Sequence, residues 1–238
     1  MNSVSCIGLA LSVIGLLSLG VSGPGYRLGV WGYKTGISLF KSSGYFGLGG
    51  VIVCLVGLAL WKRDVSSDDP IPAIIGLLLG GGVLGLALMW KYTLDKYPYI
   101  HDITTDTETP PAFVAVLPVR AGAENPAEYG GPEIARQQQA SYPNLQPGSM
   151  GGPPAVAYPR ALQAAREMGW TIVESNPQSL RIEGTDTTCW FGFQDDIVVR
   201  LAPSPAGTRV DVRSVSRVGK SDLGTNARRI QAYLTRLK

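Results

Sequence analysis

The sequence contains 238 residues with a formal net charge of +3, and only 16% of its residues are charged. Ordinary soluble domains contain about 25% charged residues, so the composition excludes a chain that is a soluble globular domain throughout. The three cysteines, Cys6, Cys54 and Cys189, include two in apolar segments, which excludes a disulfide framework.

Three long segments without charged residues follow one another in the first part of the chain: residues 1–26, 42–61 and 70–90. Each has about the 20 residues that an α-helix needs to cross the hydrocarbon core of a bilayer. The first lacks the basic start and the small-residue cleavage site of a signal peptide, so we expect it to be retained. The sequence therefore predicts three transmembrane helices, with the lipid bilayer as an immediate partner.

These segments contain no Asp, Glu, Lys, Arg or His, whereas transporters and pumps usually need such a residue within the membrane, so these functions are disfavoured. The third segment contains two GxxxG pairs, Gly76 with Gly80 and Gly81 with Gly85. Such glycines let helix backbones approach closely. We expect them to pack on another span of this chain, with a helix of another protein as the alternative. The connection over residues 27–41 mixes apolar and basic residues and could lie in the membrane interface or dock a partner.

The charges at the ends of the spans bear on orientation. The side that carries the C-terminal region has Arg27, Lys34, Lys41, Lys91 and Lys96, and the opposite side has only Lys62 and Arg63. Because Lys and Arg concentrate on the cytoplasmic side, this count favours a cytoplasmic C-terminal region.

From residue 98 the composition is that of a globular domain, so we expect a membrane region over residues 1–97 and a soluble domain over 98–238. Glycine and proline make residues 121–153 an irregular arm, with a short helix near 134–140. A helix ending at Gly169 precedes β-type runs at 170–175, 179–184, 188–193, 197–202 and 208–216. A last helix follows over 221–237. Helix, antiparallel sheet, helix predicts an α+β domain with both helices on one face.

The domain separates its charges along the chain. Residues 97–135 hold six carboxylates and one arginine, and residues 200–238 hold nine cations and two carboxylates. Nucleic-acid binding requires an uncompensated basic face, whereas here the opposite charge is available in the same domain. We therefore expect no nucleic-acid partner.

The segment YIHDITTDTETPPAF, residues 99–113, contains the only histidine. A metal site would offer His101, Asp102 and Asp106, but zinc and iron sites normally add further His or Cys ligands. A catalytic pair of His101 and Asp102 is disfavoured because adjacent residues of an extended segment point to opposite sides. We therefore expect no metal, no cofactor and no catalytic residue.

A polar clasp is the interpretation that we favour. Alternation in TRVDVRSVSRVG places Arg209, Asp211, Arg213 and Arg217 on one face of a strand. Guanidinium groups match carboxylates, so we expect Asp102 or Asp106 to bind Arg213 or Arg217 and hold the segment that leaves the membrane along the sheet. The clasp residues in these two segments are His101, Asp102, Thr104, Thr105, Asp106, Arg213, Ser216 and Arg217.

The segment before the last helix adds Lys220, Ser221, Asp222 and Asn226 to this set. Lys220 and a glycine before a helix start could attract an anion. The spacing does not fit a phosphate-binding loop, so a turn capped by Ser221, with Asp222 near the helix start, is favoured. We interpret Gln194, Asp195 and Asp196 as a solvated hairpin tip.

Two long segments, IHDITTDTETPPAF and GTRVDVRSVSRVGKSDLGTNARRIQAYL, resemble the bacterial family of unknown function DUF1499. The resemblance covers about residues 98–238. It implies no established activity, cofactor or catalytic residue, and it implies a protein of the bacterial inner membrane whose domain faces the periplasm. This orientation opposes the charge count, and we favour the periplasmic side because the charge bias is spread over a long loop.

Together these observations favour a non-enzymatic integral membrane protein, an accessory or scaffold subunit of a larger assembly with other membrane protein subunits. The alternative is a membrane-anchored protein that binds a small ligand or lipid in a pocket between the sheet and the C-terminal helix. A hydrolase using His101 is a third and weaker candidate.

Overall fold

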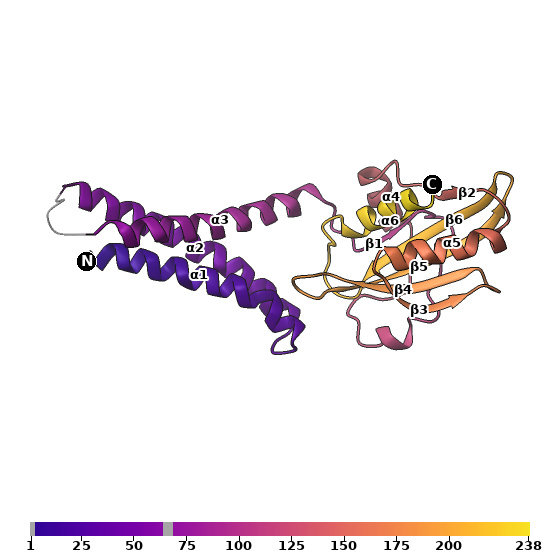
Figure 1. The fold of residues 1–238 in the computed structure, drawn as a ribbon, viewed down its shortest axis with the longest axis horizontal. Helices are drawn as coiled ribbons and strands as arrows, with labels where there is room; N and C mark the ends of the chain where they lie inside the picture. Colours follow the sequence, from indigo (N-terminus) through magenta and orange to yellow (C-terminus); the bar gives the residue numbers. More distant parts are fainter. Residues whose placement is uncertain (1–2, 64–68) are drawn as a thin grey trace. The chain divides into compact units, whose positions relative to one another are not determined.

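The computed structural model describes residues 3–63 and 69–238, and the chain divides into two compact units. The first contains the residues up to Asp95 together with the turn Cys189–Gly192, and the second contains the other residues from Lys96 onward. Figure 1 shows the long helices of the first unit and the sheet with its covering helices in the second. The predicted α+β class, with three apolar helices before an antiparallel sheet, is confirmed.

The membrane unit consists of α1 (Ser3–Arg27), α2 (Tyr33–Arg63) and α3 (Ile71–Lys96). All three helices are long and apolar enough to cross a membrane. Helix α2 begins at Tyr33, well before the uncharged run of residues 42–61. No proline lies between Tyr33 and Ser42 to interrupt a helix there. Residues 33–41, expected as part of an interfacial connection, instead form the first turns of α2.

Glycine and serine line the contacts among these helices. A Cβ atom on Gly76 would collide with the sulfur of Cys54, and one on Gly80 would lie 2.9 Å from the carbonyl oxygen of Gly47. The hydroxyl of Ser12 donates to the carbonyl oxygen of Gly76 at 2.8 Å. The first GxxxG pair of α3 therefore packs against the other spans of the chain, as close backbone approach requires glycine there.

The second pair of glycines in α3 has a different environment. A Cβ atom on Gly81 or Gly85 would meet no atom within 4 Å. Since α-helical residues separated by four positions lie on one face, this pair forms an outward-facing strip.

The second unit contains a fully antiparallel sheet in the order β1-β6-β5-β4-β3, with β2 also paired to β6. Its strands are β1 (Asp102–Thr104), β2 (Gly148–Met150), β3 (Thr171–Asn176), β4 (Arg181–Thr187), β5 (Gln194–Ser204) and β6 (Gly207–Ser216). The three-residue strand β1 adds to the sheet beside β6, and the segment after it crosses over the sheet.

One face of the sheet is covered by α5 (Pro154–Glu167) and α6 (Thr225–Arg236). Ile230 and Tyr233 of α6 pack with Ala161 of α5 and with Val210 and Val212 of β6 in one hydrophobic core. Helix α5 begins at Pro154, because proline is favoured at a helix start, and it is followed by Gly169, whose φ lies in the left-handed region. In the chain between β1 and β2 lie a short 3₁₀ helix, η1 (Pro118–Arg120), and then α4 (Gly131–Ser141).

Two sequence-based expectations about β-structure are wrong. Residues 188–193, expected as a strand, form the turn between β4 and β5, and Gly192 has a left-handed φ of +71°. The residues Gln194 to Asp196, expected as a solvated tip, are the start of β5, and Asp195 and Asp196 are buried. Carboxylates rarely enter a sheet interior without partners, and the partners here come from distant segments.

The last helix also begins later than expected. Leu223 and Gly224 have φ values of +54° and +74°, which interrupt the helix, so α6 starts at Thr225. The expected N-cap Ser221 therefore lies outside the helix. Asp222 instead accepts hydrogen bonds from the backbone N–H groups of Gly224 and Asn226, both at 2.8 Å.

Candidate functional site

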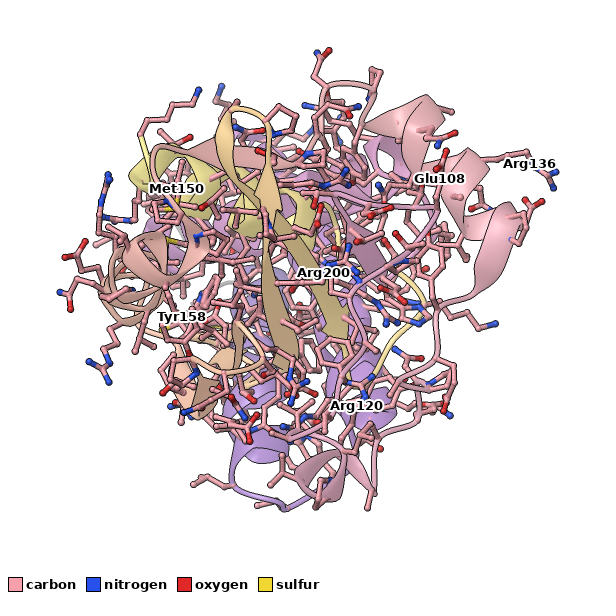
Figure 2. The ribbon with its side chains drawn as sticks, turned by 90° about the vertical axis from the view of Figure 1, so that its right-hand side faces the viewer. Glu108, Arg120, Arg136, Met150, Tyr158 and Arg200 are labelled. Atoms are coloured by element: carbon pink, nitrogen blue, oxygen red, sulfur yellow. The ribbon has the colours of Figure 1, made fainter. Side chains whose placement is uncertain are left out.

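Strand β6 presents two different faces because its side chains alternate. Val210 and Val212 face the helices and the hydrophobic core. Arg209, Asp211 and Arg213 point to the other face of the sheet. Figure 2 shows Tyr158 of α5 on one side of the sheet, and Glu108 and Arg200 on the other. This polar face is crossed by residues 105–130, which we name the strap.

Asp102 of β1, just before the strap, forms a buried ion pair with Arg213 of β6. The carboxylate oxygens of Asp102 accept hydrogen bonds from Nε and Nη2 of Arg213 at 2.9 and 2.7 Å. The guanidinium group also donates to the carbonyl oxygen of Ala127 at 2.7 Å and lies over the rings of Phe113 and Tyr129. A two-fold pairing of this kind fixes orientation as well as distance.

Asp106 binds a second group of arginines. One of its oxygens accepts hydrogen bonds from Arg200 and Arg209, each at 3.0 Å, and both arginines also bind Asp211. Burial acts to raise the pKa of Asp106, but hydrogen bonds from Thr109 and Glu108 and the charge of Arg209 outweigh it and lower the pKa. The ionised form is therefore the stable one.

Asp196 is a third point of attachment and is fully buried. Arg120, carried on η1 of the strap, donates to Asp196 at 2.6 Å, and Arg217 donates at 2.8 and 2.9 Å (Figure 2 labels Arg120). Thr185 adds a hydrogen bond at 2.7 Å. Burial opposes ionisation, but these donors lower the pKa of Asp196.

Glu183 holds the strap through its backbone. This fully buried carboxylate accepts hydrogen bonds from the N–H groups of Val114, at 3.0 and 3.1 Å, and of Val116, at 3.0 Å. Nε of Arg181 lies 2.8 Å from it. Four carboxylates, Asp102, Asp106, Glu183 and Asp196, thus bind the strap or the strand before it to the sheet.

His101 does not join a catalytic pair with its neighbour, because both oxygens of Asp102 bind Arg213. Burial lowers the pKa of His101, although Asp102 and a hydrogen bond to the backbone of Lys220 act to raise it. The imidazole is therefore held between two segments and favours its neutral form.

Asn226 and Arg229 form a second polar cluster, on the helix-covered face. Asn226 donates to the carbonyl oxygen of His101 at 2.9 Å and to the hydroxyl of Ser216 at 3.1 Å. Arg229 binds Asp195 at 2.6 Å and Asp186 at 2.8 Å. This cluster ties the start of α6 to the sheet and to the residues before β1.

The remaining sequence-predicted residues make local contacts. The backbone N–H of Thr104 donates to Gln138 at 2.9 Å, and the hydroxyl of Thr105 accepts from the N–H of Val212 at 2.9 Å. The hydroxyl of Ser221 donates to the carbonyl oxygen of Pro98 at 3.1 Å. The side chain of Lys220 is exposed.

The pairings differ in part from those expected. The structure brings Asp102 to Arg213, but Asp106 binds Arg200 and Arg209, and Arg217 binds Asp196. Arg120, Glu183, Asp195, Arg200 and Arg229 were not identified from the sequence. The period-two pattern of β5 places Asp196, Val198 and Arg200 on one face, and this signal could have identified Arg200 as a partner of the clasp.

Described residues of the second unit line a larger and a smaller hollow. The larger, about 490 Å³, is lined mainly by polar residues that include Asp106, Gln139 and Arg209. The smaller, about 340 Å³, lies beside α6 and is lined in part by Tyr97 and Tyr142. The space between the sheet and α6, where the sequence suggested a pocket, is filled by core side chains. Within residues 3–63 and 69–238 no group of three or more His, Cys, Asp or Glu side chains could hold a metal ion.

Comparison with known proteins identifies the domain that carries this strap. The sequence profile described as a protein of unknown function, DUF1499, matches residues 102–237, more than half of the chain. The chain belongs to the DUF1499 family. The matched region begins at Asp102 and includes the strap, the whole sheet and both covering helices of this DUF1499 protein. Searches of curated proteins and of solved structures found no match to the chain.

Proposed function

We propose that this DUF1499 protein is a non-enzymatic accessory or scaffold subunit of a larger protein assembly in a bacterial inner membrane. The outward glycines of α3 carry the proposal. At Gly81, Gly82 and Gly85 a Cβ atom would meet nothing within 4 Å, and the adjacent Leu78 and Met89 are 73% and 61% exposed. Membrane helices associate through small residues that allow close backbone approach, so this strip fits a helix of a partner subunit.

The use of charge in the second unit supports a protein partner over a nucleic acid. Most arginines of residues 200–238 bind carboxylates of the same unit: Arg200, Arg209, Arg213, Arg217 and Arg229. Nucleic-acid binding relies on an uncompensated basic face. Here the positive groups are already neutralised within the domain.

The short connection between the units supports a role at the membrane surface. Five residues, 97–101, separate the end of α3 from β1. The carbonyl oxygens of Pro98 and Ile100 accept hydrogen bonds from the hydroxyl of Ser221 and the N–H of Asp222. Five extended residues reach at most about 18 Å.

We assign the domain to the periplasmic side, as the resemblance to the family implies, against the cation count at the ends of the spans. A fusion of a periplasm-specific reporter after Lys238 should be active. Activity of a cytoplasm-specific reporter alone would place the domain in the cytoplasm.

The assembly proposal is tested by Gly81→Leu combined with Gly85→Leu in the full-length chain. After extraction in a gentle detergent, the wild-type protein should co-purify with a defined membrane protein that the double variant loses. Gly20→Leu on α1 is the matched control, because a Cβ at Gly20 also meets nothing within 4 Å. A wild-type protein that migrates alone, or equal loss in the control, would contradict the proposal.

Ligand binding is the second candidate, and the hollow of about 340 Å³ beside α6 favours it. The hydroxyl of Tyr142 at this hollow is buried, and among the described residues it has no hydrogen-bond partner. Native mass spectrometry of the purified protein would detect a retained lipid or small molecule. Tyr142→Phe should release it if the hydroxyl contacts the ligand.

A further inference from the structure

The larger hollow of the second unit, which we name the polar hollow, has walls from three segments that are distant in the chain. The start of the strap contributes Asp106 and Glu108. The end of α4 and the loop after it contribute Gln139 and Gln146, and β6 contributes Arg209. All of these residues belong to the second unit. The volume of about 490 Å³ lies within the range of roughly 300–1,000 Å³ that is typical of small-molecule sites.

Hydrogen bonds hold the walls of the polar hollow in place. The buried side chain of Gln138 in α4 accepts from the N–H of Thr104 at 2.9 Å and donates to the carbonyl oxygen of the same residue at 2.7 Å. These bonds join α4 to β1. The guanidinium group of Arg209 donates to Asp106 at 3.0 Å and to Asp211 at 2.9 Å. Because this frame is already formed, a ligand does not pay the entropy of ordering it.

Several polar groups on these walls have hydrogen-bonding capacity left over. Nη1 of Arg209, the carboxylate of Glu108 and the amide oxygen of Gln139 make no hydrogen bond with any other residue in the ranges 3–63 and 69–238. The amide N–H of Gln146 makes only a long contact of 3.4 Å, with the carbonyl oxygen of Pro143. The polar hollow therefore offers donors and acceptors together, and its ligand must accept and donate hydrogen bonds in turn.

The charges around the polar hollow favour a neutral ligand. Arg209 is already paired with the carboxylates of Asp106 and Asp211, so a ligand carboxylate or phosphate at its free Nη1 would be repelled by both. A metal ion is disfavoured too, because the described part of the chain gathers no three His, Cys, Asp or Glu side chains that could hold one. Neither an anion nor a metal ion matches the lining.

The polar hollow also has an apolar part, formed by Tyr142, Pro143, Leu145 and Pro147. A sugar ring presents C–H groups on its face and hydroxyl groups around its edge. Each hydroxyl both donates and accepts hydrogen bonds. Aromatic and proline rings beside amide, carboxylate and guanidinium groups match both parts of such a molecule.

We propose that the polar hollow between the strap, α4 and β6 is a binding site for a neutral saccharide. The free groups of Glu108, Gln146 and Arg209 bind its hydroxyls, and Tyr142 with the neighbouring prolines contacts its C–H groups. The site does not involve the outward glycines of α3, so it is independent of the proposed partner subunit.

The test applies the full-length protein, in nanodiscs of phosphatidylcholine and phosphatidylglycerol, to an array of neutral and acidic oligosaccharides. Glycoside detergents are avoided because their headgroups are themselves saccharides. At least one neutral oligosaccharide should bind, and isothermal titration calorimetry measures its Kd. Binding to no neutral oligosaccharide on the array would overturn the proposal. Tighter binding of acidic oligosaccharides, or of the zwitterion glycylglycine in the same titration, would also overturn it.

Two double variants locate the site. Glu108→Ala with Gln146→Ala should raise the Kd of the bound saccharide by about tenfold or more, because two side chains that bind its hydroxyls are removed. Glu167→Ala with Gln163→Ala is the matched control, since it removes the same residue types from an exposed pair on α5, where the side chains bind each other at 3.0 Å. The control should keep the wild-type Kd. An unchanged Kd in the first variant, or equal weakening in both, would contradict the assignment.

Discussion

Asp102 and Arg213 are 111 positions apart in the chain, yet both carboxylate oxygens of Asp102 accept hydrogen bonds from the Arg213 guanidinium group, at 2.9 and 2.7 Å. The side chains are only 6% and 3% exposed. This ion pair joins β1, the first strand after the membrane helices, to the neighbouring strand β6, so an electrostatic contact fixes the segment through which the chain enters the domain.

We expect Asp102→Leu to lower the free energy of unfolding of the domain by about 3–5 kcal/mol, because it leaves a buried guanidinium group without its counter-charge. Asp102→Leu combined with Arg213→Leu should cost less than the sum of the two single substitutions. Urea unfolding of the detergent-solubilised chain measures both. The control is Glu133→Gln, since the ion pair of Glu133 with Arg136 is exposed. Additive costs in the double variant would show that the two side chains are not coupled.

We expect Glu183→Ala to release the middle of the strap while the rest of the sheet stays folded. Hydrogen exchange at the amides of Val114 and Val116 should accelerate by about tenfold or more, since each buried hydrogen bond to a charged acceptor contributes about 1.5–3 kcal/mol. Glu174→Ala is the matched control, because Glu174 binds the same Arg181 but lies nearer the surface. Unchanged exchange at both amides would rule out this role of Glu183.

The stability of the domain should contain a contribution from Asp222 that decreases as pH rises. Burial raises the pKa of Asp222 to about 6, against an ordinary value of about 3.9. The folded state therefore binds the proton of the Asp222 carboxyl more tightly than the unfolded state does. The resulting stabilisation is complete below pH 4 and is lost as pH rises through about 6. Relative to Asp222→Asn, wild-type stability should fall by about 2–3 kcal/mol between pH 4 and 7.

The comparison with Asp222→Asn is essential because other groups titrate in the opposite direction. Burial lowers the pKa of His101, so protonation of that ring below its ordinary pKa disfavours the folded state. Urea unfolding of both proteins at several pH values isolates Asp222 by difference. Parallel stability curves for the two proteins would contradict a raised pKa at this position.

Two adjacent glycines of α3 should respond differently to the same small substitution. Gly80→Ala places a Cβ 2.9 Å from the carbonyl oxygen of Gly47 and should destabilise helix packing by about 1–3 kcal/mol. Gly81→Ala points into open space and should leave packing within the chain unchanged. Unfolding of the detergent-solubilised protein by increasing SDS measures the difference. Equal effects would show that Gly80 does not face α2.

The antiparallel sheet and its helices follow from local patterns, and those patterns were sufficient for most elements. The alternation of Arg209 to Ser216 identified β6 and its polar face. The turn at 188–193 was missed because its aromatic residues mimic a strand. Asp195 and Asp196 were misplaced because two adjacent carboxylates resemble a solvated tip, although in the structure each is buried against an arginine from another element.

The sequence by itself determined that the chain has three apolar spans, that an antiparallel α+β domain follows them, and that acidic and basic residues are separated along that domain. These properties depend on residue spacing and composition, which are local. Only the tertiary structure decided which carboxylate binds which arginine and which glycines of α3 pack within the chain. Several arginines compete for each carboxylate, and only the strand register and the path of the strap bring one donor within hydrogen-bonding distance.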